Sequence, residues 1–319
     1  MIELEQVTKR FPDGSLAVDA LTLEIPSGTV SVLVGSSGCG KTTTLRMINR
    51  MEEPTSGTLR IDGVDVARQP LHVLRRSIGY VIQQGGLFPH RSVLDNITTV
   101  PRLLGWPKER ARSSALEMMQ LVGLDPGLAT RYPTQLSGGQ QQRVGVARAL
   151  VTEPPVLLMD EPFGAVDPVV RVRLQDEFLR LQRELGKTVV LVTHDIDEAV
   201  RMGDRVAVFA VGGRLAQYGT PAELLAHPAD DFVADFVGST KGLRRLTVTA
   251  IDPAHLEPLD GVQAGDLAAT VDVHATLEEA LAALLRDDKQ VVGVRDGATF
   301  VGVLTPNGIH RALRESLKR

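Results

Sequence analysis

Features that would indicate an exported or membrane-spanning protein are missing from this chain of 319 residues. Its one cysteine, Cys39, cannot form an intrachain disulfide, which fits a reducing cytoplasm. No apolar stretch approaches the roughly 20 residues that cross a bilayer, and the first residues lack the basic and then apolar pattern of a signal peptide. We therefore expect a cytoplasmic protein that reaches a membrane only through a partner chain.

An excess of positive charge is also absent. The formal net charge is −4, whereas proteins that hold nucleic acid are more often strongly basic, so we expect no nucleic-acid partner. The composition, 43% hydrophobic and 23% charged, is ordinary for a globular protein. At about 100–200 residues for each domain, the length predicts two domains.

Apolar patterning predicts an α/β core. Short apolar runs rich in β-branched residues, separated by helical patterns, are typical of buried parallel strands. The runs are 29–34, 156–159, 188–193 and 205–211, and the helices are 41–50, 109–122, 139–150, 168–185 and 196–202. Alternating residues at 2–8 and 58–61 add antiparallel strands. Ligands of such folds bind at the carboxyl ends of the parallel strands.

A glycine-rich loop follows the first of these parallel strands and opens a helix. It reads Gly35, Ser36, Ser37, Gly38, Cys39, Gly40, Lys41 and Thr42. Glycines let successive backbone N–H groups turn toward phosphate oxygens, and the helix N-terminus adds its positive dipole end. We expect Lys41 to reach the β- and γ-phosphates, the Thr42 hydroxyl to bind Mg²⁺, and Thr43 to belong to the same nucleotide site.

Polar residues end two other predicted strands. Asp160 and Glu161 follow the run 156–159, and His194 follows the run 188–193. Taken alone, such carboxylates are usually just solvated and a single histidine is usually structural. Beside a phosphate loop, Asp160 can hold the Mg²⁺ shell and Glu161 can polarise an attacking water. An imidazole at position 194 can donate to a phosphate oxygen.

Between the phosphate loop and these carboxylates lies Leu136 followed by Ser137, Gly138, Gly139 and Gln140. In this order the motifs resemble those of the ATP-binding cassette (ABC) importer ATPases, and the resemblance covers residues 1–238. It implies a P-loop NTPase core of the α/β class, with an N-terminal antiparallel β subdomain and a helical subdomain that carries the signature. It also implies ATP and Mg²⁺ as cofactors.

The resemblance assigns further site residues. Phe11 matches an aromatic that stacks on adenine, although a core or surface aromatic is the alternative. Gln83 matches a glutamine that contacts Mg²⁺ and water and responds to the membrane subunit. Asp167 matches a loop that crosses the dimer interface, next to Val166 where family members usually have leucine. The predicted catalytic residues are therefore Lys41, Gln83, Glu161 and His194.

The signature predicts a homodimer. Ser137, Gly138, Gly139 and Gln140 open a helix, and a helix N-terminus is an anion site that would have no use in a monomer. Two chains arranged head to tail would place each signature over the phosphate loop of the other chain. The resemblance then implies permease subunits, indirectly a solute-binding protein, and a position at the inner face of the membrane.

Finer features resemble the osmoprotectant branch, the importers of glycine betaine, proline betaine, carnitine or choline. They include residues 46–50, 78–90, 100–106, 132–133 and 161–165. This inference is by analogy, since none of these residues contacts solute. An amino-acid-type importer is the alternative, and a non-transport ABC ATPase is a more distant one, because the chain lacks sustained heptads and a basic stripe.

The C-terminal part predicts a second, small α/β domain. A helix at 277–285, strands at 290–294 and 300–304 and a helix at 309–317 resemble a single CBS module at 267–319, preceded by a linker or degenerate remnant at 239–266. In that family a Thr-x-x-Asp turn holds a ribose, whereas here the turn has Thr305 and Gly308, which argues against adenosine binding. Bracing of the dimer and sensing of ligand or ionic strength both stay open.

Overall fold

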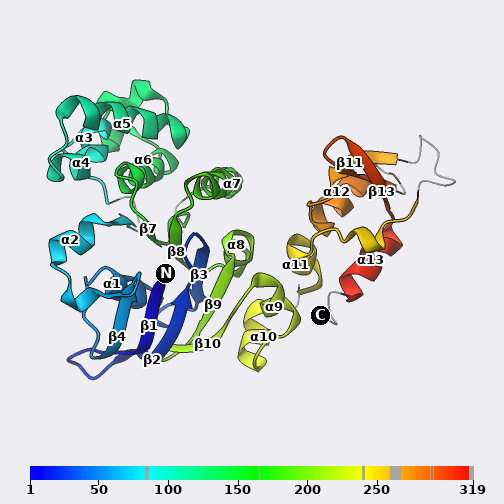
Figure 1. Ribbon diagram of the computed structural model, residues 1–319, viewed down its shortest axis with the longest axis horizontal. Helices are drawn as coiled ribbons and strands as arrows, with labels where there is room; N and C mark the ends of the chain where they lie inside the picture. The colour runs from blue at the N-terminus through cyan, green and yellow to red at the C-terminus, as the bar shows by residue number, and fades with distance from the viewer. Residues whose placement is uncertain are drawn as a thin grey trace. The chain divides into compact units, whose positions relative to one another are not determined.

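The computed structural model describes residues 1–82, 86–164, 166–238, 241–258, 267–287, 289 and 291–315 (Figure 1). The chain divides into two compact units, Met1–Tyr218 and Gly219–Arg319. This division lies before the boundary expected near residue 238, because α9 (Pro221–Ala226) packs against α11 (Lys241–Val248) and so belongs with the second unit. In the described parts of the chain, no helix is long and apolar enough to cross a membrane.

A six-stranded sheet forms the centre of the first unit, in the order β10-β9-β3-β8-β7-β6. The strands are β3 (Val30–Gly35), β6 (Ile78–Val81), β7 (Val156–Asp160), β8 (Thr188–Thr193), β9 (Arg205–Ala210) and β10 (Arg214–Gly219). The pairs β3–β8, β3–β9, β6–β7 and β7–β8 are parallel. Every residue of β3, β7 and β8 is buried, which confirms the prediction from their apolar runs. The carboxyl ends of these strands therefore meet at one edge.

A four-stranded antiparallel sheet lies next to this sheet in the first unit. Its order is β2-β1-β4-β5, with β1 (Ile2–Arg10), β2 (Leu16–Ile25), β4 (Ser56–Ile61) and β5 (Val64–Asp65). Ile2 and Leu21 of this sheet share one apolar core with Leu33 and Phe209 of the six-stranded sheet. The helix α1 (Lys41–Ile48) adds Leu45 to the same core, so the phosphate loop that precedes α1 is supported from both sheets.

Helices form the rest of the first unit. A group of helices stands at the top of Figure 1: α3 (Val93–Ile97), α4 (Thr99–Leu103), α5 (Lys108–Leu121) and α6 (Gly138–Leu150), of which α6 packs against β6. Three other helices are α2 (Leu71–Arg76), α7 (Pro168–Leu185) and α8 (Ile196–Met202). The longer helices confirm the sequence pattern, whereas α2, α3 and α4 have five or six residues each and were not predicted.

The second unit contains a three-stranded sheet in the order β11-β12-β13. Besides α9 and α11, its elements are α10 (Asp231–Val237), β11 (Leu267–Asp272), α12 (Leu277–Asp287), β12 (Val291–Asp296), β13 (Thr299–Leu304) and α13 (Pro306–Glu315). The predicted helix, two strands and helix are confirmed, and β11 adds a strand parallel to β12. Residues 241–258, expected as a linker or remnant, supply Leu246 and Ile251 to the core of this unit.

Candidate active site

The phosphate loop runs from the end of β3 into α1. Gly40 caps α1 with φ 98°, in the left-handed region, and a Cβ at this position would collide with the carbonyl oxygen of Ala17 on β2. A Cβ at Gly35 would collide in the same way with the carbonyl oxygen of Phe209 on β9. Glycine is therefore required at both ends of the loop, because the loop passes directly against two strands.

Lys41 lies inside the loop. Its side chain is buried, and its Nζ donates hydrogen bonds to the carbonyl oxygens of Gly35, at 2.8 Å, and Ser36, at 2.9 Å. The ammonium group is thus held where the expected phosphate oxygens would meet it. Cys39 is buried against the same Nζ, at 3.5 Å from its Sγ, so its side chain packs within the loop.

The remaining loop residues divide by exposure. Ser36, Ser37 and Gly38 are exposed, whereas Thr42 and Thr43 are half-buried in the first turn of α1. The backbone of the exposed residues is accessible to a ligand, as the motif predicts.

Asp160 and Thr42 form the polar contact between β7 and α1. The Thr42 hydroxyl donates to Asp160 Oδ1 at 3.0 Å, and Asp160 is 4% exposed. Burial raises the pKa of the Asp160 carboxyl, while the Thr42 hydrogen bond and the charges of Arg46 and Lys41 oppose that rise. A hydroxyl and a carboxylate side by side are oxygen ligands of the kind that Mg²⁺ takes, so the residues present fit this ion.

Glu161 and His194 meet at the ends of neighbouring strands. Glu161 has φ 44° and donates its backbone N–H to the Val192 carbonyl at 3.0 Å, which ties the end of β7 to β8. Its Oε1 lies 3.2 Å from Nδ1 of His194, whose side chain is 62% exposed. The structure therefore brings together the two residues that the strand pattern placed at one edge.

Residues Ser137–Gln140 form a capped helix start. The Ser137 hydroxyl accepts a hydrogen bond from the Gln140 backbone N–H at 3.3 Å, and Gln140 Oε1 accepts one from the Ser137 backbone N–H at 2.9 Å. The side chain of Gln140 therefore stabilises the turn itself. Ser137 and Gly138 are exposed and Gly139 is half-buried, so the backbone at this helix start faces outward.

The other expected residues lie around these groups. Phe11 is half-buried in the turn between β1 and β2, with Lys9 Nζ 5.1 Å from its ring centroid. Asp167 is exposed and directly precedes α7. Gln83 lies outside the described residues.

Two residues near Asp160 were missed as site residues. Tyr80 on β6 is half-buried, and burial, followed by the charge of Asp160, raises the pKa of its hydroxyl. Arg46 on α1 hydrogen-bonds to Tyr80 and favours the ionised form of Asp160. The spacing of Arg46, one helical turn after Thr42, is a signal that could have identified it.

Comparison with known proteins adds family evidence to this geometry. A model of the ABC transporter family matches residues 18–164. The chain is 53% identical over 264 residues to the osmoprotectant import ATP-binding protein OsmV of Salmonella typhimurium, covering 81% of this chain and 69% of that protein. It is 52% identical over 241 residues to the glycine betaine/carnitine/choline transport ATP-binding protein OpuCA of Bacillus subtilis, covering 76% of this chain. That match spans 63% of OpuCA, less than two thirds of its length.

Similarity to a solved structure agrees with the sequence relatives. The dimeric structure of a post-hydrolysis form of the ATP-binding cassette MJ0796, bound to ADP and Pi, matches with a TM-score of 0.64 and 35% identity. The match covers 69% of this chain and 99% of that one.

Proposed function

The chain belongs to the ATP-binding proteins of the ABC transporter family, and from this premise we propose that it hydrolyses ATP to drive import of a quaternary-ammonium osmoprotectant. The observation that carries the hydrolytic part is the meeting of Lys41, Thr42, Asp160, Glu161 and His194 at one edge of the parallel sheet. Phosphoryl transfer needs positioning and charge neutralisation more than covalent chemistry, and these groups can supply both.

We propose the following role for each group in the reaction. Lys41 and the loop N–H groups hold the β- and γ-phosphates, with Phe11 against adenine and Ser36, Ser37 and Thr43 along the phosphates. Thr42 and Asp160, with Gln83, would hold Mg²⁺, which when bound neutralises charge on the phosphate oxygens. Glu161 accepts a proton from water as the water oxygen bonds to the γ-phosphorus and the bond to ADP breaks.

In the same reaction His194 serves as the γ-phosphate contact. It lies 3.2 Å from the Glu161 carboxylate, so one side chain can orient both the base and the phosphate.

We further propose that two copies complete the site. The exposed helix start at Ser137–Gly139 would contact the γ-phosphate bound on the other copy, and the exposed Asp167 would lie at the interface. The solved relative with ADP and Pi is dimeric, and the capping box leaves the N–H groups of Gly138 and Gly139 without an intrahelical partner. Two such groups at a helix N-terminus suit an anion.

A Glu161→Gln variant tests base and dimer together. Glutamine keeps the size of the side chain but cannot take the proton, so we expect ATP binding near the wild-type level and turnover lower by roughly 10²–10⁴-fold. Sedimentation with Mg-ATP should show a stable dimer. Lys41→Ala is the contrasting variant, which should lose both binding and turnover. Wild-type turnover in the Glu161 variant would refute its role as the base, and a persistent monomer would refute the dimer.

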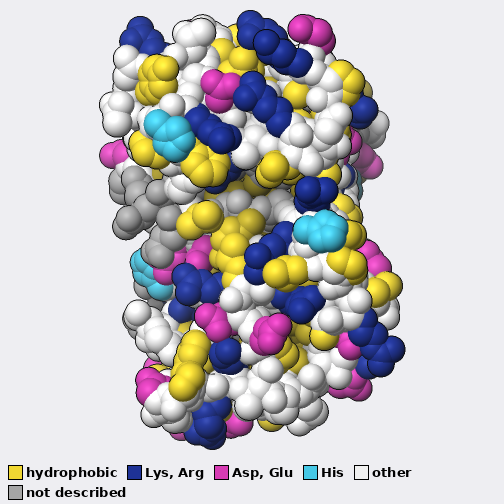
Figure 2. Space-filling view, turned by 90° about the vertical axis from the view of Figure 1, so that its left-hand side faces the viewer, with side chains coloured by type: hydrophobic (Ala, Val, Ile, Leu, Met, Phe, Trp, Pro, Cys, Tyr) yellow, Lys and Arg dark blue, Asp and Glu magenta, His cyan; other side chains and the backbone are white. Residues whose placement is uncertain are grey.

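A surface of the first unit suits the expected permease subunits. Exposed apolar side chains come from α2, from α4 and its C-cap residue, and from between the two helices: Leu71, Val73, Ile82, Phe88, Leu103 and Leu104. Figure 2 views the molecule from the side of α2 and α4 and shows apolar side chains flanked by Lys and Arg. Buried Asn96 accepts from the Phe88 N–H and donates to the Phe88 carbonyl, so Phe88 is held in place. Such a patch is typical of a protein interface.

The solute is proposed from the relatives. OsmV is named for osmoprotectant import and OpuCA for glycine betaine, carnitine and choline transport. The assay is uptake of labelled glycine betaine by vesicles that contain this chain, its permease and the cognate solute-binding protein, with choline, carnitine and amino acids as competitors. Competition by amino acids alone would favour the amino-acid-type alternative. In this proposed assembly the chain would lie at the inner face of the membrane.

For the second unit we propose a regulatory or dimer-bracing CBS-like module at 267–319. The order β11, α12, β12, β13, α13 supports the resemblance, and the β13–α13 turn is closed by the Gly308 N–H donating to the Thr305 hydroxyl at 3.0 Å. Removing residues 241–319 and measuring ATP turnover against salt separates the roles. A changed salt profile supports sensing, an unchanged profile with a weaker dimer supports bracing, and Trp106 fluorescence on heating checks that the first unit remains folded.

A further inference from the structure

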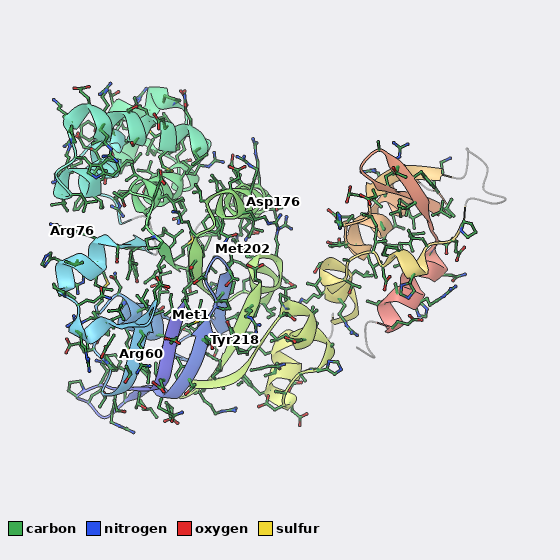
Figure 3. All side chains as sticks on the ribbon, in the orientation of Figure 1. Met1, Arg60, Arg76, Asp176, Met202 and Tyr218 are labelled. Atoms are coloured by element: carbon green, nitrogen blue, oxygen red, sulfur yellow. The ribbon has the colours of Figure 1, made fainter. Side chains whose placement is uncertain are left out.

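The helices α7 and α8 each follow one of the two proposed catalytic residues along the chain. The loop after Glu161 leads into α7, and the turn that contains His194 leads into α8. Pro168 begins α7 directly after Asp167, and Asp195 caps α8 directly after His194. Figure 3 labels Asp176 on α7 and Met202 on α8, and the two helices lie side by side. An exposed ion pair, Arg201 to Asp176 at 2.7 Å, joins the last turn of α8 to the middle of α7.

Arg171, in the first turn of α7, bridges the two loops. Its Nη2 donates to the carbonyl oxygen of Val166 at 3.1 Å, and its Nη1 lies 3.8 Å from Oδ2 of Asp195. Val166 is 6% exposed. The other carboxylate oxygen of Asp195 accepts from the backbone N–H groups of Asp197 and Glu198 and so caps α8. One guanidinium therefore connects the loop after Glu161 with the turn that carries His194.

A second contact between α7 and α8 also holds the turn that contains His194. Gln175 Nε2 donates to Glu198 Oε1 at 3.0 Å, and both residues are buried. Glu198 also hydrogen-bonds to the Thr193 side chain, whose hydroxyl accepts from the Asp195 N–H at 3.1 Å. Residues 193 and 195 are thus held on both sides of His194, whose exposed side chain extends from a fixed turn.

One nitrogen of the Arg171 guanidinium makes no hydrogen bond to any described residue. Its Nε is buried and has no hydrogen-bond partner among the residues that the structure describes. A buried donor without a partner costs stability, so maximal pairing does not explain where this guanidinium lies. Its planar fork instead spans two acceptors on different loops, a geometry that lysine cannot reproduce.

We propose that Arg171 is a positioning residue that sets His194 relative to Glu161 by holding the β8–α8 turn against the loop 161–167. The assignment rests on the proposed hydrolytic function of Glu161 and His194. Because misplacing a catalytic group by about 1 Å can lower a rate by as much as 100-fold, Arg171→Ala should lower kcat by about 10–100-fold. The KM for ATP should change little, because the contacts of Lys41 and the phosphate loop remain.

A matched control separates positioning from helix packing. Arg201→Ala breaks the exposed ion pair between the last turn of α8 and the middle of α7, and it should keep the wild-type kcat. Arg171→Lys keeps the charge but can satisfy only one of the two acceptors, so its kcat should fall between those of Arg171→Ala and the wild type. A kcat of Arg171→Ala equal to that of Arg201→Ala would overturn the assignment.

A double-mutant cycle tests the bridge itself. Asp195→Asn keeps an oxygen that can cap α8 but removes the charge that faces Arg171. If the bridge is the cause, Asp195→Asn lowers kcat in the wild type and has little further effect in Arg171→Ala. Losses that multiply would contradict the bridge.

A readout without turnover distinguishes this assignment from the proposed function. Histidine-labelled NMR of the full chain, with the His194 signal identified by its loss in His194→Ala, should show that signal shifted or broadened in Arg171→Ala and unchanged in Arg201→Ala. An unchanged signal in both variants would refute the positioning role. Absence of ATP turnover in the wild type, with the signal shifted in Arg171→Ala, would refute the proposed function alone.

Discussion

Replacing Thr42 by valine tests the contact between the phosphate loop and Asp160. Valine keeps the branched shape of threonine but removes the hydroxyl that donates to Asp160 Oδ1 at 3.0 Å. Because the carboxylate is 4% exposed, water cannot readily replace the lost donor. A hydrogen bond to a charged group contributes about 1.5–3 kcal/mol. For a unit of this size each kcal/mol shifts the melting temperature by about 2–4 °C, so the first unit should melt about 3–12 °C lower.

The pH dependence of this loss has a definite sign. Burial raises the pKa of Asp160 above its ordinary 3.8, and the Thr42 hydrogen bond lowers that pKa in part. The bond favours the ionised carboxylate, so its contribution is present above the pKa of Asp160 and is lost as pH falls through it. The difference in melting temperature between wild type and Thr42→Val should therefore be greatest near neutral pH and shrink toward acid.

Trp106 makes the measurement specific. It is the only tryptophan and lies in the first unit, so its fluorescence during heating reports that unit. Thr43→Val is the matched control, one residue along the same helix, and should melt within about 2 °C of wild type, as expected for a substitution without a buried partner. Magnesium-dependent turnover should fall at least about 100-fold in Thr42→Val. Equal melting of both variants at neutral pH, or a difference that grows toward acid, would refute the reasoning.

Two further substitutions test a buried carboxyl and the phosphate loop. Burial raises the pKa of Glu198 above its ordinary 4.5, so its contribution to stability is present below pH 4.5 and is lost as pH rises through the folded pKa. As pH rises through this range, the melting temperature of Glu198→Gln should increase relative to that of the wild type. A difference in melting temperature that does not change with pH would contradict this. Gly40→Ala should destabilise by more than the roughly 1–3 kcal/mol of left-handed strain and weaken ATP binding at least about tenfold. Gly14→Ala carries the strain alone, since no described atom lies within 4 Å of its added Cβ, and equal unfolding free energies would refute the collision at Gly40.

The parts of the fold that could be predicted are those that depend on short stretches of sequence. β3, β7 and β8 are continuous apolar runs, and the phosphate loop stands between a strand and a helix, so each could be recognised without its neighbours. The meeting of Glu161 and His194 followed from one general rule, because parallel strands end at the same edge. For these elements the prediction agrees with the structure because it requires little knowledge of contacts between residues far apart in the sequence.

Other parts depend on contacts that a sequence pattern does not contain. The pairing of β1 with β2 shifts register three times, which disrupts the alternation that would predict β2. Helices of five or six residues, such as α3, are too short to show a helical period. The unit boundary after Tyr218 arises from packing of α9 on α11. The proposed role of Arg171 could not be predicted either, because only folding brings the Val166 carbonyl and Asp195 to the two terminal nitrogens of its guanidinium.

Gly139 shows how the structure narrows an interpretation that the sequence left broad. A glycine in a motif can serve a left-handed turn, a close contact within the chain or a close contact with something outside it. Gly139 lies within α6, and no described atom lies within 4 Å of the Cβ that another residue would place there. Both internal explanations therefore fail, because Gly139 has no positive φ and its added Cβ would meet no described atom. Glycine costs a helix about 1 kcal/mol relative to alanine, so a contact from outside the chain is the explanation that remains. The proposed dimer would supply such a contact, because a phosphate bound on the second copy would approach the open side of Gly139.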